Sequence, residues 1–436
     1  MPIFHPDLAA RPVPRYTSYP TAAQFHSGVG AAEQAAALAA VPAGAPVSLY
    51  LHIPFCRQIC WYCGCNTGLA APDRMRRYAK ALKAEIATVG AALRGQVTAI
   101  SFGGGSPNAL EPRALAGIIA AVRAAFAITP DAEIAMELDP RAITPDLAPQ
   151  LAAAGVNRIS LGVQTFAPHV QAAINRLQPP GMIERAVADF RAAGVQAINF
   201  DLMFGLPGQS AIDLDESITR AIALRPDRVA MFAYAHLPGA IPRQRMIRDA
   251  DLPGPAARFA MAALAHRRFT QAGWQAIGFD HFALPDDRLA VAARAGRLHR
   301  NFQGYATDPG MALIGLGATA ISQFPGLIVQ NEKHLATWEA LVMASGLAGA
   351  RGVAVADDDV RRGAVIERLL CDGAVDVPAD MLDGARPALA PLAARGLVGL
   401  AGRRLAITPD GWPYARLVAA AFDAHLKAPE RHARAV

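Results

Sequence analysis

The chain has 436 residues, of which 42 are Lys or Arg and 36 are Asp or Glu, giving a formal net charge of +6 and an isoelectric point near 9.2. Its residues are 53% hydrophobic and 18% charged, which excludes a disordered chain and indicates large cores in two domains, or in one large α/β domain with appendages. Nearly all basic residues are arginines, and they form no dense block, so we expect no nucleic-acid partner. A solvated surface accounts for most of this excess, and an anionic substrate is a weaker interpretation.

The order of charged and apolar residues predicts neither a targeting signal nor a membrane span. The opening "MPIFHPDLAARP" has no basic stretch followed by an apolar run, so we predict no signal peptide. The most apolar long window, 311–329, is interrupted by three glycines, a proline and a glutamine, and it reads as buried core. We therefore predict a cytoplasmic protein without a membrane span, and a monomer because no large apolar surface is indicated.

The predicted elements begin after residue 45, where "AAVPAGAP" marks a link at the end of an N-terminal extension. The segment from Asp73 is typical of a helix, with Asp73 as its N-cap and Tyr78, Leu82, Ile86 and Val89 on one face. Strands alternating with helices predict parallel βα units that curl into a full or partial barrel. Six apolar runs are the expected strands, at 47–53, 97–104, 132–139, 158–166, 197–205 and 228–236.

Three of these strands carry polar residues on one face. Met136 and Leu138 alternate with Glu137 and Asp139, Leu161 and Val163 with Ser160 and Gln164, and Phe200 and Leu202 with Asn199 and Asp201. A parallel sheet covered on both faces is normally apolar throughout, so these side chains either satisfy one another or line a site for a polar ligand. We favour the ligand, because a filled barrel core is usually branched aliphatic.

The pattern changes near residue 350. Short helices and a hairpin-like stretch at 396–411 resemble a winged-helix module, which without a concentrated basic helix indicates a packing or lid domain. We therefore divide the chain into an extension (1–45) that contributes to the active site, a barrel domain with a substrate-covering region (46–350), and a mostly helical C-terminal domain (351–436).

Four of the five cysteines lie in the stretch "CRQICWYCGC". Cys56, Cys60 and Cys63 have the spacing C-x3-C-x2-C, and Cys65 follows; a buried thiol is the expectation for the distant Cys371. In a reducing compartment such spacing indicates a metal site. Zinc is one alternative, but structural zinc sites normally have two short pairs with a longer spacer. Three thiolates on one loop favour a [4Fe–4S] cluster with one iron left without a protein ligand.

This cysteine motif after the first strand resembles the radical S-adenosylmethionine (SAM) superfamily, whose fold is a partial (βα)6 barrel. Within it, the string "YLHIPFC…C.YCGCN" is similar to the oxygen-independent coproporphyrinogen III oxidase (coproporphyrinogen dehydrogenase) family, an α/β fold class with the N-terminal extension and helical C-terminal domain described above. The resemblance covers most of the chain, through "RYTSYPTA" (15–22), "GGGSPN" (103–108), "MELDPR" (136–141), "LGVQTF" (161–166), "DLMFGLPGQ" (201–209), "YAHLP" (234–238) and "LHRNFQGY" (298–305).

The resemblance implies roles for individual residues. Cys56, Cys60 and Cys63 would ligate the cluster, whereas the role of Cys65 stays open. The family usually has threonine at Ser106, and a hydroxyl remains there. Cofactor contacts are implied at Tyr50, Tyr62, Gly104, Gly105, Ser106, Glu137, Gln164, Arg176, Asp201, Ala235 and Ile321.

The implied reaction begins when the reduced cluster cleaves SAM to methionine and a 5′-deoxyadenosyl radical. The radical removes a hydrogen from a propionate β-carbon, and loss of carbon dioxide and one electron leaves a vinyl group. Rings A and B of coproporphyrinogen III are treated in this way, giving protoporphyrinogen IX in anaerobic heme biosynthesis. Arg15 and Arg300 are our candidates for binding substrate carboxylates, with ordinary ion pairs as the alternative. A reduced flavodoxin or ferredoxin would supply electrons.

Three other functions stay open at this stage. A related radical SAM enzyme would act on another tetrapyrrole such as heme. A heme-carrying chaperone would keep the barrel without turnover, although such relatives tend to lack the cysteine found here at Cys65. A zinc-binding nucleic-acid module would bind DNA with steep salt dependence.

Overall fold

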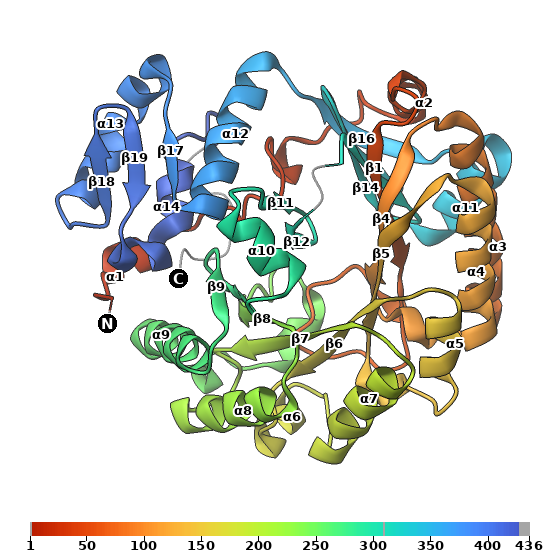
Figure 1. Ribbon diagram of the computed structural model, residues 1–436, viewed down its shortest axis with the longest axis horizontal. Helices are drawn as coiled ribbons and strands as arrows, with labels where there is room; N and C mark the ends of the chain where they lie inside the picture. Colours follow the sequence, from red (N-terminus) through yellow and green to blue (C-terminus); the bar gives the residue numbers. More distant parts are fainter. Residues whose placement is uncertain (1, 308–309, 427–436) are drawn as a thin grey trace.

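The computed structural model describes residues 2–307 and 310–426 (Figure 1). Its main element is a 12-stranded sheet in the order β16-β15-β14-β13-β1-β4-β5-β6-β7-β8-β10-β9. The strands from β13 to β8 in this order run parallel to their neighbours. The predicted strands are confirmed with small shifts in their bounds. They are β1 (Pro46–Ile53), β4 (Gln96–Gly104), β5 (Ile128–Leu138), β6 (Arg158–Gln164), β7 (Ala197–Phe204) and β8 (Arg228–Ala233), joined by β13 (Ala312–Leu316).

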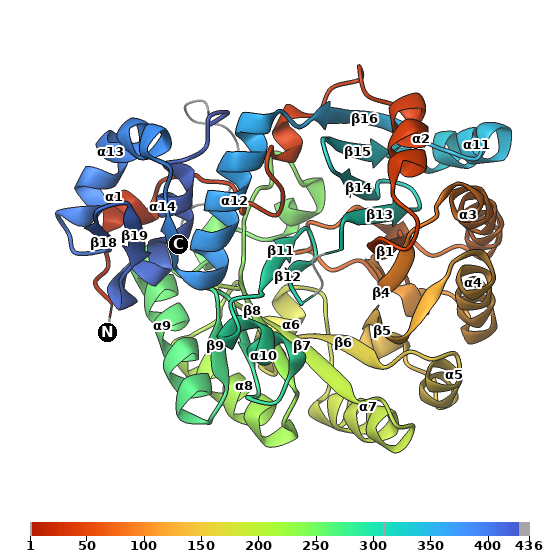
Figure 2. The same cartoon turned by 45° about the horizontal axis from the view of Figure 1, so that its top comes forward.

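Helices cover the outer face of this sheet, and the two end strands β16 and β9 do not pair with each other, so the barrel is partial as predicted (Figures 1 and 2). A right-handed crossover through a helix joins successive parallel strands and places each helix outside. The covering helices are α3 (Pro72–Ala92), α4 (Pro112–Ala125), α5 (Leu147–Ala153), α7 (Pro180–Ala192), α8 (Ala211–Leu224) and α9 (Pro255–Gln271).

The start of α3 corrects one prediction. Asp73 is not the N-cap: the helix begins at Pro72, Ala71 occupies the cap position, and Asp73 lies in the first turn, paired with Arg76. Proline is favoured at the first helical position because its missing N–H has no partner there and its φ is already helical. The predicted apolar face is confirmed, since its four residues are buried: Tyr78, Leu82, Ile86 and Val89.

Antiparallel strands extend the parallel sheet at both edges. The apolar window 311–329 forms β13, β14 (Ile321–Phe324) and part of β15 (Leu327–Asn331), which confirms it as core. Beyond them lies β16 (Gly349–Ala354), and the other edge carries β10 (His281–Ala283) and β9 (Gln275–Ile277). In the described part of the chain, every helix is too short or too polar to cross a bilayer.

A second core lies beside the barrel and joins both ends of the chain (Figures 1 and 2). Leu8 and Tyr16 pack there with Leu369, Leu389 and Phe422. The predicted hairpin is formed by β18 (Val398–Ala401) and β19 (Arg404–Ile407), and β19 also pairs with β17 (Ala374–Asp376). The predicted domain limits stay a prediction, and the limit at 350/351 lies within β16. The elements here are α1 (Pro6–Ala9), α12 (Asp357–Asp372), β17 (Ala374–Asp376), α13 (Ala379–Ala393), β18 (Val398–Ala401), β19 (Arg404–Ile407) and α14 (Ala415–Ala420).

Short elements connect these two bodies and complete the chain. They are α2 (Ala31–Ala40), β2 (Phe55–Cys56), β3 (Gly68–Leu69), α6 (Pro168–Ala173), α10 (Arg288–Arg294), β11 (His299–Asn301), β12 (Gly304–Ala306) and α11 (Leu335–Ser345), with 3-10 turns at 22–24, 107–109, 140–142, 242–246, 249–251 and 409–414.

Candidate active site

A cavity of about 580 Å³ opens at the carboxyl ends of the parallel strands, where ligands bind in barrels of this kind. The polar residues Glu137, Asp139, Ser160, Gln164 and Asp201 line it, while Met136 and Phe200 are buried in the main core, as the alternation predicts. Leu138 is also buried, but it contributes to the cavity lining. Most of the predicted site residues line this cavity: Arg15, Cys56, Cys60, Tyr62, Cys63, Gly104, Gly105, Ser106, Glu137, Gln164, Arg176, Asp201 and Ala235. Cys65 lines it too, whereas its lining does not include Tyr50, Arg300 and Ile321.

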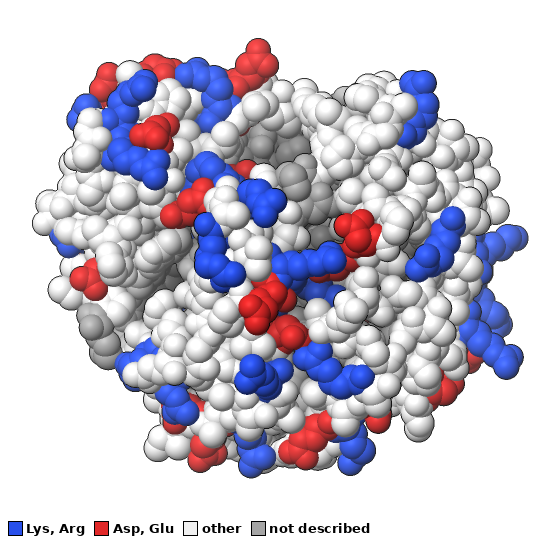
Figure 3. Space-filling model, in the orientation of Figure 1, with Lys and Arg blue, Asp and Glu red and all other residues white. Residues whose placement is uncertain are grey.

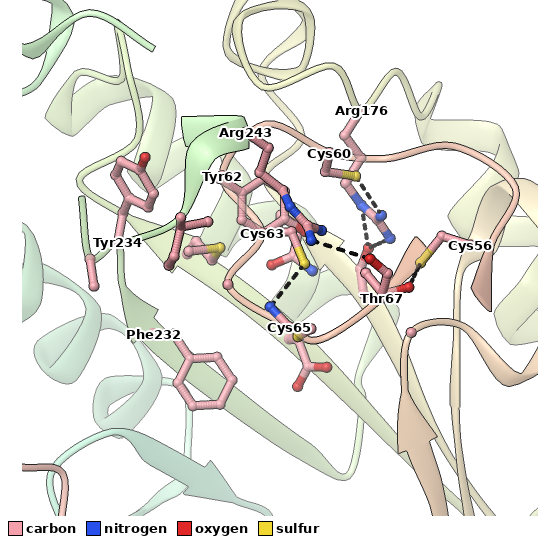
Figure 4. A pocket seen from close by; sticks show the side chains of 18 of the residues that line it. Cys56, Cys60, Tyr62, Cys63, Cys65, Thr67, Arg176, Phe232, Tyr234 and Arg243 are labelled. Carbon is pink, nitrogen blue, oxygen red and sulfur yellow. Dashed lines mark hydrogen bonds between the residues drawn. The ribbon is translucent and has the colours of Figure 1, made fainter. Parts of the chain in front are cut away.

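The cysteine loop runs between β1 and α3 (Figure 4). Backbone hydrogen bonds within the loop and to a distant segment hold it in place. The strands β2 and β3 pair in parallel, which brings Thr67 beside Cys56, with 3.2 Å between their Oγ1 and Sγ atoms. The backbone N–H of Trp61 donates to the carbonyl of Ile174 at 3.1 Å, which ties the loop to the segment after α6. The loop is therefore fixed at both its ends and its middle.

Two arginines donate to the sulfur of Cys60. Arg141 Nη2 and Arg176 Nη1 each lie 3.3 Å from its Sγ atom. Asp139 binds both arginines, at 2.7 Å to Arg141 and 3.3 Å to Arg176. Although burial raises the pKa of Asp139, the guanidiniums of Arg176 and Arg141 lower it below its usual value. Arg141 was not among the site residues predicted from the sequence, where its only signal was its place at the end of "MELDPR".

Cys63 and Cys65 form a coupled pair at the next turn of the loop. The backbone N–H of Cys65 lies 3.4 Å from Cys63 Sγ. A hydrogen bond from the Cys65 thiol, aided by its backbone N–H, lowers the pKa of the Cys63 thiol, and the contact between the two side chains holds the pKa of the Cys65 thiol well above its usual value. The pair therefore favours ionisation at Cys63, one of the three predicted cluster ligands.

The glycine-rich turn at the end of β4 lies beside the carboxyl groups of Glu137 and Asp201, which we call the acidic wall. A Cβ atom at Gly103 would lie 2.8 Å from the carboxyl carbon of Glu137, and Gly104 has φ +108, which favours glycine. The Gly104 N–H donates to Glu137 Oε2 at 3.3 Å. Enclosure by protein and the nearby Asp201 raise the pKa of Glu137 to about 7. Ser106 turns its hydroxyl to Asn108 Oδ1 at 2.9 Å.

Hydrogen bonds hold Asp201 within this wall. Its carboxylate accepts from Ser160 Oγ at 2.9 Å and from Asn199 Nδ2 at 2.8 Å. Burial is the main cause that raises the pKa of Asp201 above its usual value. The three side chains come from the neighbouring strands β6 and β7. These polar side chains therefore hydrogen-bond to one another in part, which was the alternative hypothesis to a bound ligand.

Two further predicted residues occupy strained or bridging positions. Gln164 has φ +64 at a bulge between β6 and β7, a costly conformation for a side-chain-bearing residue that is typical of functional sites. Ala235 is fixed through Gln244, whose Nε2 donates to its carbonyl at 3.1 Å and to that of Tyr62 at 2.8 Å. Gln244 is buried and had no signal in the sequence.

Tyr50 and Ile321 lie behind the cavity wall. The Tyr50 hydroxyl is 3.0 Å from His52 Nδ1, and its ring meets Phe302 edge-on at 4.7 Å. Tyr50 pairs with Gly315 on β13, and Ile321 begins the next strand, β14. Their predicted cofactor contacts stay predictions.

Two further arginines, Arg15 and Arg300, lie next to each other, and only Arg15 lines the cavity. Arg15 lines it and donates to the carbonyl of Ala233 at 3.4 Å. Arg300 stacks on the rings of Phe279 and Tyr305 at 4.8 and 4.6 Å, and its Nη2 lies 3.5 Å from the carbonyl of Arg15. Figure 3 shows Lys and Arg interspersed with Asp and Glu across the middle of the face seen in Figure 1.

The donor set fits the predicted cofactors. Three thiols on one loop line the cavity, and buried N–H donors already face one of these sulfurs, as expected around an iron–sulfur cluster. The carboxylates of Glu137 and Asp201 suit the positive amine and sulfonium of SAM, and Gly104 and Gly105 line the same cavity. Among the described residues, no three His, Cys, Asp or Glu converge as ligands of one metal ion do.

Comparisons with known proteins agree with this site. Residues 50–221 match the family model of the radical SAM superfamily. An oxygen-independent coproporphyrinogen III oxidase from Bradyrhizobium diazoefficiens is 45% identical, with 97% of each chain covered. One from Escherichia coli K12 is 39% identical over 96% of this chain and 94% of its own.

A solved structure of coproporphyrinogen III oxidase (HemN) from Escherichia coli, described as a radical SAM enzyme, superposes with a TM-score of 0.90 at 38% identity. The match covers 94% of this chain and 98% of that one. The chain therefore belongs to the oxygen-independent coproporphyrinogen III oxidase family of the radical SAM superfamily.

Proposed function

We propose that the protein is an oxidoreductase that converts the ring A and ring B propionates of coproporphyrinogen III to vinyl groups. Each propionate loses one hydrogen atom, carbon dioxide and one electron, and the product is protoporphyrinogen IX. Family membership implies the cofactors, a [4Fe–4S] cluster and SAM. The observation that carries the proposal is one cavity lined by three loop cysteines, by the carboxylates of Glu137 and Asp201, and by the guanidinium of Arg15.

Each group of residues has a task in this reaction. Cys56, Cys60 and Cys63 hold the cluster, which with bound SAM supplies one-electron chemistry able to remove hydrogen from an unactivated carbon. The carboxylates of Glu137 and Asp201 hold the positive end of SAM. The surrounding strands enclose the reacting groups and exclude water from them.

We also propose the setting in which the protein acts. The five cysteines are all free thiols, which suits a reducing cytoplasm and a flavodoxin or ferredoxin as electron donor. We propose that it acts as a monomer. Light scattering at micromolar concentration tests the monomer, and cluster bleaching by reduced flavodoxin or ferredoxin under anaerobic conditions tests the donor.

The central experiment uses the anaerobically purified, reduced protein with SAM, with and without coproporphyrinogen III. 5′-Deoxyadenosine and the porphyrin products are quantified by mass spectrometry. We expect substrate to raise 5′-deoxyadenosine and the product to lack two carboxyl groups. Cys56→Ala should abolish both signals together with bound iron, whereas Cys371→Ala, a matched cysteine variant, should keep its iron and sulfide.

Other outcomes would redirect the assignment. SAM cleavage with an unchanged tetrapyrrole would mean that the substrate is another one, such as heme. A complete cluster without SAM cleavage, combined with stoichiometric heme binding, would favour the heme-carrying chaperone over the enzyme.

A further inference from the structure

A second cavity, of about 1070 Å³, adjoins the active-site cavity. We call it the outer chamber; its walls are α9, the β9–β10 edge of the sheet and the 409–414 turn with α14. The two cavities share Arg15, Phe232 and Ala233, so these residues form the boundary between them. None of the tasks assigned above uses the outer chamber.

The volumes argue that the substrate extends beyond the active-site cavity. Its 580 Å³ lies within the range of about 300–1,000 Å³ that is usual for one ligand of moderate size. The proposed reaction places SAM and a tetrapyrrole with four carboxylates there together. Only part of the tetrapyrrole then has room beside SAM, and the adjoining chamber is larger than the cavity itself.

The lining of the outer chamber suits an amphipathic occupant. Aromatic rings form much of its wall, among them Phe259, Phe279, Phe282 and Trp412. Such surfaces pack on pyrrole rings, and a few placed polar groups fix orientation. The lining also carries four arginines and three aspartates, and two of these arginines, Arg15 and Arg416, belong to one cluster.

Among the described residues, this cluster joins the guanidiniums of Arg15, Arg300 and Arg416 with the carboxylate of Asp280. Burial lowers the pKa of Arg416 to about 10, and Arg15 and Arg300 add to the lowering, while Asp280 opposes it. Asp280 also accepts from His281 at 2.6 Å, so its charge is shared. The Nε and Nη1 atoms of Arg300 are buried and have no hydrogen-bond partner among the described residues. A carboxylate bound here would meet guanidinium groups, which bind carboxylates through charge-assisted hydrogen bonds.

We propose, resting on the function proposed above, that the outer chamber binds the part of the tetrapyrrole that is not reacting, with a propionate carboxylate held by Arg15 and Arg416. The reacting propionate then reaches past Phe232 and Ala233 toward the cysteine loop. The two propionates of rings C and D, which the reaction leaves intact, are the natural partners of these guanidiniums. Turning the substrate within this chamber would present the second reactive propionate.

The test uses coproporphyrin III, a fluorescent tetracarboxylate, titrated into the cluster-loaded protein. Arg416→Gln should raise its Kd about tenfold, the loss expected for one charge-assisted hydrogen bond. Ala263→Trp fills the chamber from α9 and should raise Kd at least as much. The matched controls are Arg220→Gln and Ala260→Trp, exposed residues of α8 and α9 outside both cavities, which should bind as the wild type does. The tetramethyl ester should bind weakly, with Arg416→Gln making no further difference.

Each alternative result has a defined meaning. Wild-type Kd in both Arg416→Gln and Ala263→Trp would overturn the outer-chamber site while leaving the proposed function intact. An effect of Ala263→Trp on SAM affinity and not on coproporphyrin III would also overturn it, since SAM would be the occupant. A wild-type protein with an intact cluster that neither binds coproporphyrin III nor converts coproporphyrinogen III would overturn the proposed function itself. If Ala263→Trp does not fold, Arg416→Gln alone decides the matter.

Discussion

The two sides of the active-site cavity differ in the groups that their arginines contact. At the cysteine loop, Arg141 and Arg176 share Asp139 and Cys60 through contacts of 2.7 to 3.3 Å. On the other side, Arg15, which lines the cavity, and its neighbours Arg300 and Arg416 donate to backbone carbonyls at 3.4 to 3.5 Å. The cysteine side is thus held together by charged side chains before any ligand binds, whereas on the other side we propose that the guanidiniums of Arg15 and Arg416 bind a substrate carboxylate.

The largest effect should follow from removing the carboxylate of Asp139 on the cysteine side of the cavity. Asp139→Ala leaves two guanidiniums buried without their shared carboxylate, and we expect the free energy of unfolding to fall by about 3–5 kcal/mol. Urea unfolding at neutral pH measures it. Asp131→Ala, which removes an exposed carboxylate on β5, should change it by less than about 0.5 kcal/mol. Equal losses in both variants would contradict the comparison.

The arginine side should respond in substrate affinity and not in stability. Arg15→Gln removes a guanidinium that lines both cavities, so we expect KM for coproporphyrinogen III to rise about tenfold with little change in kcat. Arg220→Gln is the surface control. Steady-state kinetics under anaerobic conditions decide it, and an unchanged KM would show that the substrate does not reach Arg15.

The arginines that donate to the sulfur of Cys60 should influence the midpoint reduction potential of the cluster. Hydrogen bonds to a ligand sulfur stabilise the reduced, more negative cluster, so Arg141→Met should lower the midpoint potential by about 50 mV. A redox titration followed by electron paramagnetic resonance measures it, with Arg113→Met, exposed on α4, as the control. An unchanged midpoint potential with full iron content would exclude this role.

The smallest effect concerns the acidic wall. Because the folded-state pKa of Glu137, about 7, exceeds the ordinary 4.5, the native state binds more protons between these values and the wild type loses stability as pH rises through them. Glu137→Gln has no such carboxyl group. Its free energy of unfolding, compared with that of the wild type at the same pH, should therefore be about 1 kcal/mol higher at pH 8 than at pH 4.5. The gain is small because the carboxylate faces the cavity. Urea unfolding of the cluster-loaded protein at both pH values tests this.

The same variant should bind SAM more weakly, since it removes a negative charge from the wall that faces the cofactor. Equilibrium dialysis with SAM measures the affinity, and Glu111→Gln, exposed before α4, is the control for both measurements. A stability difference that is the same at pH 4.5 and pH 8 would show that Glu137 does not titrate as described.

The sequence by itself determined the parallel strands, the polar faces of three of them and the cysteine loop, because each depends on residues close together in the chain. Strand alternation placed Glu137 and Asp201 inside the barrel, and the spacing of Cys56, Cys60 and Cys63 predicted the kind of metal site. Local signals were less reliable at element ends, where Pro72 displaced Asp73 as the determinant of the start of α3.

Only the tertiary structure decided which distant groups meet. Arg141 reaches Cys60, and Gln244 joins Tyr62 to Ala235, across segments that no sequence period relates. Arg15 and Arg416 come from opposite ends of the chain and share one chamber, because the second core packs the N-terminal segment against α14. The physical reason is that hydrophobic packing, which is not specific to residue pairs, chooses these neighbours, and the charges then acquire partners only once the chain has folded.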